Sequence, residues 1–300
     1  MDLSICIPVY RFDPSEFVQA LHRQGMAGSF NFEILLFDDA SGDAALTEKL
    51  KKLDELKHVR VQFLEKNHGR SAIRNLLAKE AKGEYLLFSD CDAAAPDDHF
   101  ILRYAEQFRK ADVIYGGRTY PPDPKAVKKE YRLRYQYGVK REVSAADERQ
   151  KKPFARFMTN NYVISRTMAL ELPFDETLKG YGHEDTLLGK ELREKDVTIL
   201  HIDNPLHHIG LETAEEFLNK TKEGIRNLSE LYDRGMLDKR DSGVIRAYEK
   251  IKRSGFRKWI MKKLGANAYG RLKNGSVNLR MFDLWKLSLF IQEQSSSKGR

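Results

Sequence analysis

The sequence predicts an α/β protein with a mostly parallel, doubly wound sheet and a C-terminal helical extension. Apolar runs of strand length lie at 34–37, 59–64 and 85–88, and each is bounded by polar or turn-forming residues. Stretches in which apolar residues recur at helical spacing lie between these runs. Strands that alternate with helices in units of about 25–30 residues are typical of a parallel sheet with helices on both faces.

The N-terminal elements follow from local signals. The apolar run 3–9 predicts a first strand, and a helix is expected over 14–24, where Pro14 suits the first turn and Asp13 a cap. The remaining elements follow from apolar runs and from helical spacing of apolar residues. Further strands are expected at 34–37, 59–64, 85–88 and 113–116, and further helices at about 44–56, 71–82 and 97–109.

The sequence changes character over 121–153, which is charged and rich in tyrosine, and which predicts a helix with a mobile loop. Strand character returns over 157–164 and 197–202. Helices are expected directly after Glu184-Asp185 and over 212–233.

Composition excludes several classes of protein. Hydrophobic residues make up 41% of the chain, which is enough for a substantial core and argues against global disorder. No apolar run approaches the roughly 18 residues of a membrane-spanning helix. Met1-Asp2 leads straight into a strand, which argues against a signal peptide, and two cysteines provide no disulfide framework. We therefore expect a cytoplasmic protein.

The net charge of +8 is unevenly distributed. Residues 246–300 carry +11, so residues 1–245 sum to about −3. Within 246–291 the basic residues surround aromatic and aliphatic residues at helical spacing. This predicts either an interfacial helix on anionic lipid, at the inner face of the cytoplasmic membrane, or a helical lid or dimer surface. No motif for nucleic-acid binding is present.

Two pairs of acids follow predicted strands. Asp90-Cys91-Asp92 ends the run 85–88, and Asp38-Asp39 ends the run 34–37, where open α/β sheets bind ligands. Repulsion would raise the pKa of these acids unless a cation or hydrogen-bond donors intervene. A divalent metal suits Asp90 and Asp92, whereas a base N–H and a ribose hydroxyl suit Asp38 and Asp39. The alternative is that Asp38, Ser41 and Asp43 form turns and caps.

Two further groups stand at predicted helix starts. Arg70 and Arg74 could hold a diphosphate, or could be ordinary exposed helix arginines. Glu184-Asp185 follows glycines at 180 and 182, and the helix dipole favours ionised acids there. An ionised carboxylate can act as general base on an acceptor hydroxyl, and a capping pair is the alternative.

His207-His208 lies between a predicted strand and a predicted helix. A histidine in such a loop could complete a metal site with Asp92, or could be a hydrogen-bonded structural residue. The local sequence lacks a ligand spacing such as His-x-x-x-His, so it does not decide between these.

In order along the chain, the motifs are Pro8-Val9-Tyr10, Asp-Asp-x-Ser, Gly-x-x-x-x-Arg-Asn, Asp-x-Asp, Gly-x-Glu-Asp and a late histidine. This order resembles family 2 glycosyltransferases with the Rossmann-like GT-A fold, over about residues 1–235. It is most similar to bacterial members that build surface polysaccharides. The resemblance implies a nucleotide-sugar half at 1–118, an acceptor half at 119–235, and a basic amphipathic helical tail at 236–300.

The resemblance also implies an inverting reaction that uses a nucleotide sugar, usually a UDP-sugar, a glycan or lipid-linked acceptor, and Mn²⁺ or Mg²⁺. Asp92 and His208 would bind the metal, with His208 aligned better than His207. Asp185 would be the base, and Glu184 would orient the acceptor. The donor-binding residues would be Pro8, Val9 and Tyr10 at the base, Asp38 and Asp39 on uracil and ribose, Arg70 or Arg74 at the nucleotide, Asp90 on ribose, and Cys91.

Other functions compete with this one. A nucleotidyltransferase shares a crevice for metal and nucleoside, but it usually has a Gly-rich basic loop after the first strand, which Pro8–Phe12 lacks. A non-catalytic nucleotide- or glycan-binding module is the other alternative, and the presence of Asp92, Asp185 and His208 together argues against it. No Gln-x-x-Arg-Trp motif is present, which argues against a processive synthase.

Overall fold

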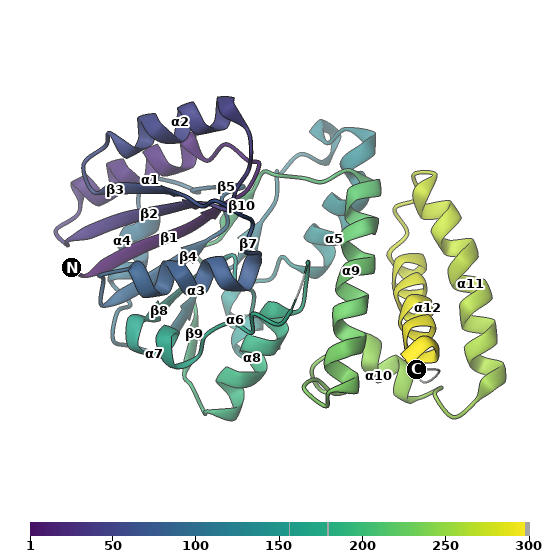
Figure 1. Ribbon diagram of the computed structural model, residues 1–300. Helices are drawn as coiled ribbons and strands as arrows, with labels where there is room; N and C mark the ends of the chain where they lie inside the picture. Colours follow the sequence, from purple (N-terminus) through teal and green to yellow (C-terminus); the bar gives the residue numbers. More distant parts are fainter. Residues whose placement is uncertain (156, 179, 298–300) are drawn as a thin grey trace. The chain divides into compact units, whose positions relative to one another are not determined.

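The computed structural model describes residues 1–155, 157–178 and 180–297, which form two compact units (Figure 1). Unit 1 comprises Met1–Pro121, Glu142–Thr177 and Glu191–Gly210. Unit 2 comprises Pro122–Arg141, Leu178–Lys190 and Leu211–Arg300. The division at residue 235 expected from the sequence stays a prediction.

Unit 1 is built on a mixed, mostly parallel sheet with the strand order β3-β2-β1-β4-β8-β6-β9. Only β8 runs antiparallel to its neighbours β4 and β6 among the strands described for this sheet. The strands are β1 (Leu3–Val9), β2 (Phe32–Asp38), β3 (Val59–Phe63), β4 (Tyr85–Ser89), β6 (Val113–Tyr115), β8 (Asn161–Ser165) and β9 (Ile199–His201). The predicted α/β class with a mostly parallel sheet is confirmed.

Helices cover both faces of this sheet. On one face α1 contacts both α2 and α4, and on the other face α3 packs against α7 (Figure 1). The apolar side chains of β1, α1 and α2 form the main core, with Leu3, Ile5, Ile7 and Leu21 fully buried. The helices are α1 (Ser15–Ala27), α2 (Ala44–Asp54), α3 (Arg70–Glu80), α4 (Phe100–Ala105), α6 (Ala146–Gln150) and α7 (Arg166–Glu171).

Several predicted elements are shorter than expected, and the strand predicted over 197–202 covers only Ile199–His201. The helix predicted over 97–109 is α4, which ends at Ala105. Turn hydrogen bonds follow it, and Arg109 adopts a positive φ of 69°, which an α-helix does not accommodate. The strand predicted over 157–164 begins only at Asn161, because Phe157 packs against the rings of Tyr115 and Tyr162 instead of joining the ladder.

A small second sheet, which the sequence did not predict, lies beside the main sheet of unit 1. Its strands are β5 (Ala93–Ala94), β7 (Arg118–Thr119) and β10 (Leu206–His208), in the order β5-β10-β7. Buried Asn161 of β8 connects the two sheets. Its Nδ2 donates hydrogen bonds to the main-chain oxygens of Gly117 and Asn204, which precede β7 and β10, at 2.8 and 2.9 Å. Strands of two or three residues are too short to give a periodic signal.

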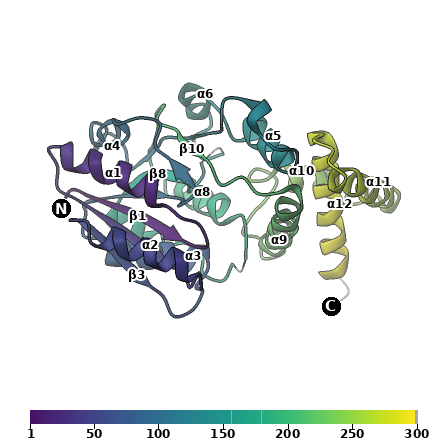
Figure 2. The same ribbon diagram turned by 90° about the horizontal axis from the view of Figure 1, so that it is seen from above.

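Unit 2 is helical. The helix α9 begins with a capping box between Thr213 and Glu216, and α12 packs against both α9 and α11. The helices α11 and α12 lie side by side (Figures 1 and 2). The helices are α5 (Arg132–Arg141), α9 (Ala214–Asp233), α10 (Gly243–Glu249), α11 (Gly255–Lys273) and α12 (Leu279–Ser297), with short 3-10 turns at Pro124–Ala126 and Lys129–Tyr131.

The aromatic residues of the basic tail divide between two environments. Phe282, Trp285 and Phe290 of α12 are at most 3% exposed, and Phe282 stacks on Phe217 of α9. These rings therefore form part of the core of unit 2. Phe256 and Trp259 of α11 are instead 70% and 52% exposed. Within the residues that the structure describes, no helix is both long and apolar enough to cross a membrane.

His201, at the end of β9, is a neutral buried histidine. Its Nδ1 accepts a hydrogen bond from Arg149 Nε at 3.2 Å, and its Nε2 donates to the main-chain oxygen of Pro153 at 3.0 Å. Burial lowers the pKa of His201 from 6.5 to about 4, and the nearby Arg149 charge acts in the same direction. A second proton would have to sit on Nδ1, facing the Arg149 N–H.

We expect this histidine to make the protein less stable in acid. Between pH 6.5 and 4 the unfolded chain binds a proton that folded His201 does not, so stability falls as the pH is lowered through this range. The loss at pH 5 is on the order of 2 kcal/mol. Urea unfolding at pH 7.5, 6 and 5 measures the free energy of unfolding. This free energy should fall less between pH 7.5 and 5 for His201→Gln than for the wild type. Half-buried His183 also has its pKa lowered by burial, so part of the fall in stability should remain in His201→Gln.

The exposed His99→Gln variant is the control for this measurement. An acid profile of His201→Gln that is identical to the wild type would contradict the role assigned to His201.

Candidate active site

The predicted acids lie at one edge of the main sheet. Because β1, β2 and β4 are parallel, their carboxyl ends meet at the same edge. The strands β2 and β4 are not neighbours, because β1 lies between them. Pro8-Val9-Tyr10 therefore separates the two acid pairs. Tyr10 is 45% exposed, and the guanidinium of Arg11 lies 5.0 Å from the centre of its ring.

Asp38 has the turn role that was considered as the alternative. Its carboxylate accepts hydrogen bonds from the hydroxyl of Ser41 and from the Ser41 N–H, the latter at 3.3 Å. The Ser41 hydroxyl oxygen in turn accepts the Arg11 N–H at 2.8 Å. Asp43 caps α2 by accepting the N–H groups of Ala45 and Leu46. Asp38 and Asp43 therefore hold the loop after β2.

Asp39 connects β2 to the turn before α3. Its two carboxylate oxygens accept the main-chain N–H groups of His68 and Gly69 at 2.7 and 3.0 Å. Its main-chain oxygen accepts Asn67 Nδ2 at 3.0 Å. Gly69 has a positive φ of 83°, which this turn requires and which glycine adopts without strain. The side chain is buried next to the start of α3.

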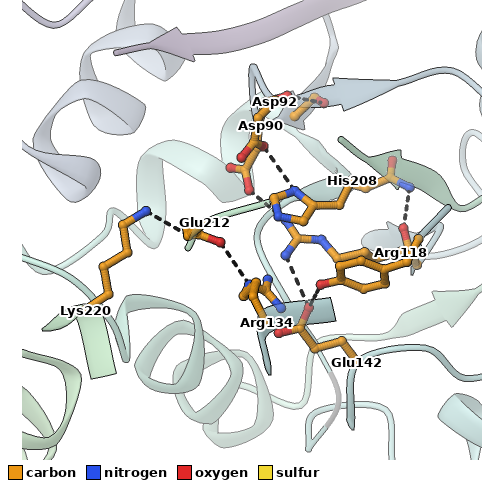
Figure 3. A network of polar contacts seen from close by, with 12 residues as sticks. Asp90, Asp92, Arg118, Arg134, Glu142, His208, Glu212 and Lys220 are labelled. Atoms are coloured by element: carbon orange, nitrogen blue, oxygen red, sulfur yellow. Dashed lines mark hydrogen bonds and ion pairs between the residues drawn. The ribbon is translucent and has the colours of Figure 1, made fainter. Parts of the chain in front are cut away.

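Asp90 is paired with two arginines, and Figure 3 shows Arg118 beside it. Arg74 Nη2 is 2.8 Å from Asp90 Oδ1, and Arg118 Nη2 is 3.0 Å from Oδ2. Arg74 is 2% exposed, so it is not an ordinary surface arginine of a helix. The expected repulsion between the acids is therefore relieved at Asp90 by two guanidinium groups. Removing either arginine would leave Asp90 with a single guanidinium partner.

Arg118, Tyr120 and Glu142 were missed by the sequence analysis. Arg118 Nη1 lies 3.4 Å from Glu142 Oε2, and the hydroxyl of Tyr120 donates to the same oxygen. The Tyr120 ring also meets the His208 ring edge to face, with centres 5.5 Å apart. Arg118 belongs to β7, which pairs with β10, and its place beside Asp90 follows from that pairing. No local signal in the sequence could have revealed it.

Asp92 and His208 are brought together by the small sheet. β10 pairs with β5 so that His208 lies opposite Ala93, the residue after Asp92. His208 Nδ1 is 3.5 Å from Asp92 Oδ1, which is longer than a good hydrogen bond (Figure 3). Successive residues of a strand face opposite sides, so β10 directs His207 away from Asp92. The structure therefore places His208, and not His207, beside Asp92.

The polar atoms of this pair are buried. Among the residues that the structure describes, Asp92 Oδ1 and both ring nitrogens of His208 have no hydrogen-bond partner. Burial would raise the pKa of Asp92, but His208, Arg118 and Arg70 outweigh burial and hold that pKa well below its usual range. In folded proteins generally, most buried polar atoms have a hydrogen-bond partner, so these facing atoms are suited to bind a ligand.

The thiol of Cys91 is protonated and packs on the core. Its side chain packs against the hydrophobic core of unit 1, and burial, together with the charge of Asp92, raises its pKa to about 12. The thiol stays protonated at neutral pH and is not a nucleophile. Its packing gives no support to the donor contact expected from the resemblance.

Glu184 and Asp185 belong to unit 2 and open α8 (Glu184–Glu194), as predicted. Glu184 is 8% exposed. Asp185 Oδ1 accepts the Thr186 N–H at 2.7 Å, which is the capping interaction considered from the sequence. This hydrogen bond and the start of the helix both favour an ionised carboxylate. Capping therefore supports the ionised state that a general base needs.

The loop before α8 is held by α9, which the sequence analysis did not anticipate. Asn227 Nδ2 donates to the main-chain oxygens of Tyr181 and Gly182 at 3.2 and 3.3 Å. Gly182 has a φ of 97°, and a Cβ built on it would lie 3.2 Å from the Cα of Gly224. Glycine in the middle of a helix is unfavourable, so Gly224 was a signal that another segment approaches α9 closely.

A second polar cluster of unit 2 joins α5 to α9 (Figure 3). Glu212 accepts from Arg134 Nε at 3.0 Å and from Lys220 Nζ at 2.8 Å. The Lys220 ammonium also lies 5.3 Å from the centre of the Tyr181 ring, in the loop that precedes Glu184. This cluster therefore places a cation at the loop that carries the two acids.

This fold and the acids at its strand ends define a glycosyltransferase of the GT-A type. Residues 4–170 match the profile of glycosyl transferase family 2, which is more than half of the chain. The chain belongs to this family and is a glycosyltransferase. Family membership decides against the nucleotidyltransferase and non-catalytic alternatives.

Relatives in sequence agree with this assignment. The uncharacterized glycosyltransferase YwdF of Bacillus subtilis (strain 168) is 26% identical over 260 residues, which cover 84% of this chain and 92% of that protein. A Rickettsia conorii glycosyltransferase is 39% identical over 93 residues, but these cover only 30% of this chain and 14% of that protein.

Solved structures show the same fold. S. aureus TarS 1-349 in complex with UDP superimposes with a TM-score of 0.53 at 17% identity, covering 100% of this chain and 92% of that chain. The mannosyltransferase PcManGT of Pyrobaculum calidifontis, in complex with GDP-Man and Mn²⁺, gives 0.54 at 11% identity and covers 99% and 75%. At these identities the likeness concerns the fold alone.

Proposed function

We propose that this glycosyltransferase moves a sugar from a UDP-sugar to a hydroxyl of a glycan or lipid-linked acceptor in surface-polysaccharide synthesis. The reaction inverts the anomeric carbon and requires Mn²⁺ or Mg²⁺. The observation that carries the proposal is the buried pair of Asp92 and His208, whose facing polar atoms have no hydrogen-bond partner among the described residues.

Asp92 and His208 fit a divalent cation. An ionised carboxylate with an imidazole suits Mn²⁺, and the low pKa of Asp92 keeps its carboxylate charged. Within the described part of the chain, no group of three or more His, Cys, Asp or Glu side chains could hold a metal. Water or the donor diphosphate would therefore complete the coordination, as is common for Mg²⁺ bound to substrate phosphates. When bound, the cation stabilises the charge of the leaving diphosphate.

The rest of the edge suits the nucleotide. The exposed ring of Tyr10, next to Pro8 and Val9, offers a surface for a base. Each carboxylate oxygen of Asp39 accepts one main-chain N–H and keeps a second lone pair for uracil or ribose. Asp90 keeps a lone pair on each oxygen in the same way, so the ribose contact remains part of the proposal. Arg74 acts mainly by holding Asp90, which leaves Arg70 as the residue for the diphosphate.

The chemical step follows from the same residues. The acceptor hydroxyl oxygen forms a bond to the anomeric carbon as the bond from that carbon to the diphosphate oxygen breaks. The hydroxyl proton goes to Asp185, and Glu184 orients the acceptor. Attack on the side opposite the leaving group gives inversion. The nucleoside diphosphate leaves with the bond's electron pair.

The nucleotide is tested by thermal unfolding with UDP, GDP and CDP, each with and without Mn²⁺. Ligand that binds only the folded state raises Tm by mass action, so UDP with Mn²⁺ should give the largest rise. The neighbours carry UDP, UDP-GlcNAc or GDP-Man, so GDP is the informative competitor. If no nucleotide stabilises the protein in a metal-dependent way, the proposal is wrong.

A further inference from the structure

One face of α11 exposes large apolar side chains. Phe256 and Trp259 are 70% and 52% exposed, and Leu264 in the next turn is 44% exposed. The two rings stack, with centres 6.3 Å apart and planes at 20°. Ile260 is partly exposed on the same side. We call Phe256, Trp259, Ile260 and Leu264 the apolar patch of α11.

The opposite face of α11 is a packed one. Gly265, Ala268 and Leu272 are buried, and the missing side chain of Gly265 leaves room for Ser288 of α12. Residues 256, 259 and 263 follow one another at helical spacing on the side away from these three. Phe256 and Trp259 therefore lie away from the core of unit 2. Ile260 and Leu264 precede buried Ala268 at i, i+4 spacing and border the packed face.

Cations surround this patch. The helix α11 contains Arg257, Lys258, Lys262, Lys263, Arg271 and Lys273 and no acidic residue. Lys263 Nζ lies 4.3 Å from the centre of the Trp259 ring. Residues 246–300 carry +11, whereas residues 1–245 sum to about −3, so the positive field is concentrated on this part of the chain.

We propose that this face of α11 binds an anionic lipid bilayer. The stacked rings and aliphatic side chains enter the boundary between head groups and acyl chains, and the lysines and arginines contact the anionic head groups. The inference goes beyond the donor-site proposal and does not depend on it.

Charge and shape favour a bilayer over other occupants. A symmetric dimer through this face would place the patch against its own copy, and the cations around it would repel each other. Bases of single-stranded nucleic acid need aromatic faces to stack on, but here the two rings stack on each other. The aliphatic Ile260 and Leu264 beside them suit acyl chains.

The test is co-sedimentation of the full chain with vesicles. At about 0.1 M NaCl we expect binding to phosphatidylcholine vesicles that contain about 30% phosphatidylglycerol. Binding should be at least ~10-fold weaker to phosphatidylcholine alone and at about 0.5 M NaCl. Trp259 should show a blue-shifted emission with anionic vesicles, because Trp285 is already buried.

Two double variants separate the contribution of the aromatic side chains to vesicle binding from that of the basic side chains. Phe256→Ser/Trp259→Ser and Arg257→Glu/Lys263→Glu should each weaken vesicle binding by about 10-fold or more. The matched controls are Leu102→Ser, an exposed apolar residue of α4, and Lys51→Glu/Lys52→Glu on α2, and both should bind like the wild type. UDP-dependent thermal shift, measured on every variant, reports separately on folding and on the donor site.

Several results would overturn the proposal. These are equal binding to neutral and anionic vesicles, or wild-type binding by Phe256→Ser/Trp259→Ser. Binding of a single-stranded oligonucleotide without vesicle binding would assign the surface to nucleic acid. A dimer that is lost in Phe256→Ser/Trp259→Ser, again without vesicle binding, would assign it to a second copy of the chain.

Discussion

Replacing Asp185 by Asn is expected to slow sugar transfer by about 10²–10⁴-fold, the usual contribution of a general base. The amide is isosteric and can still accept the Thr186 N–H that Asp185 accepts, so α8 should keep its start. What it cannot do is take the proton of the acceptor hydroxyl. Transfer is followed by product formation with a UDP-sugar, and donor binding by the UDP-dependent rise in Tm.

The control for this variant is Glu215→Gln. Glu215 is an exposed carboxylate in the first turn of α9, as Asp185 is in the first turn of α8. It should transfer sugar at the wild-type rate. Transfer by Asp185→Asn at the wild-type rate would remove Asp185 as the base, and loss of UDP binding in Asp185→Asn would show a structural effect instead.

Replacing Asp92 or His208 by Ala is expected to weaken Mn²⁺-dependent UDP binding by at least about 100-fold. Each substitution removes one of the two side chains whose facing atoms have no other partner among the described residues. The loss is measured without turnover, as the disappearance of the free Mn²⁺ signal in electron paramagnetic resonance during titration with protein and UDP.

His207→Ala is the matched control for His208→Ala. The two histidines are adjacent on β10, but alternation directs them to opposite sides, so His207→Ala should bind Mn²⁺ and UDP like the wild type. Equal losses in both histidine variants would contradict the assignment of His208. Unchanged Mn²⁺ binding in both Asp92→Ala and His208→Ala would contradict the metal site.

Much of the fold could be predicted because buried helices and strands have regular patterns of apolar residues in the sequence. The runs that became β1, β2 and β4 are continuous and apolar, since a strand covered on both faces buries every side chain. The direction of β8 could not be predicted in this way, because an apolar run reads the same whether the strand is parallel or antiparallel. The short strands β5, β7 and β10 gave no periodic signal.

The acids of the site were found for a similar reason. Asp39, Asp90 and Asp92 follow apolar runs directly, and the carboxyl ends of strands are where α/β sheets bind ligands. Arg118 was not found as a partner of Asp90, because it reaches Asp90 only through strand pairing, and Glu142 in turn contacts Arg118. Asn227 reaches the loop before Asp185 in the same way, from a helix more than forty residues later.

The sequence by itself determined the alternation of strands and helices, the strand ends that carry acids, and the resemblance to family 2 glycosyltransferases. These features are local, because each depends on neighbouring residues in one element. Only the tertiary structure decided that His208 faces Asp92, that two arginines hold Asp90, and that Phe256 and Trp259 stay exposed while Phe282 and Trp285 are buried. The physical reason is that these outcomes depend on which distant segments pack together, and residue periodicity carries no information about pairing partners.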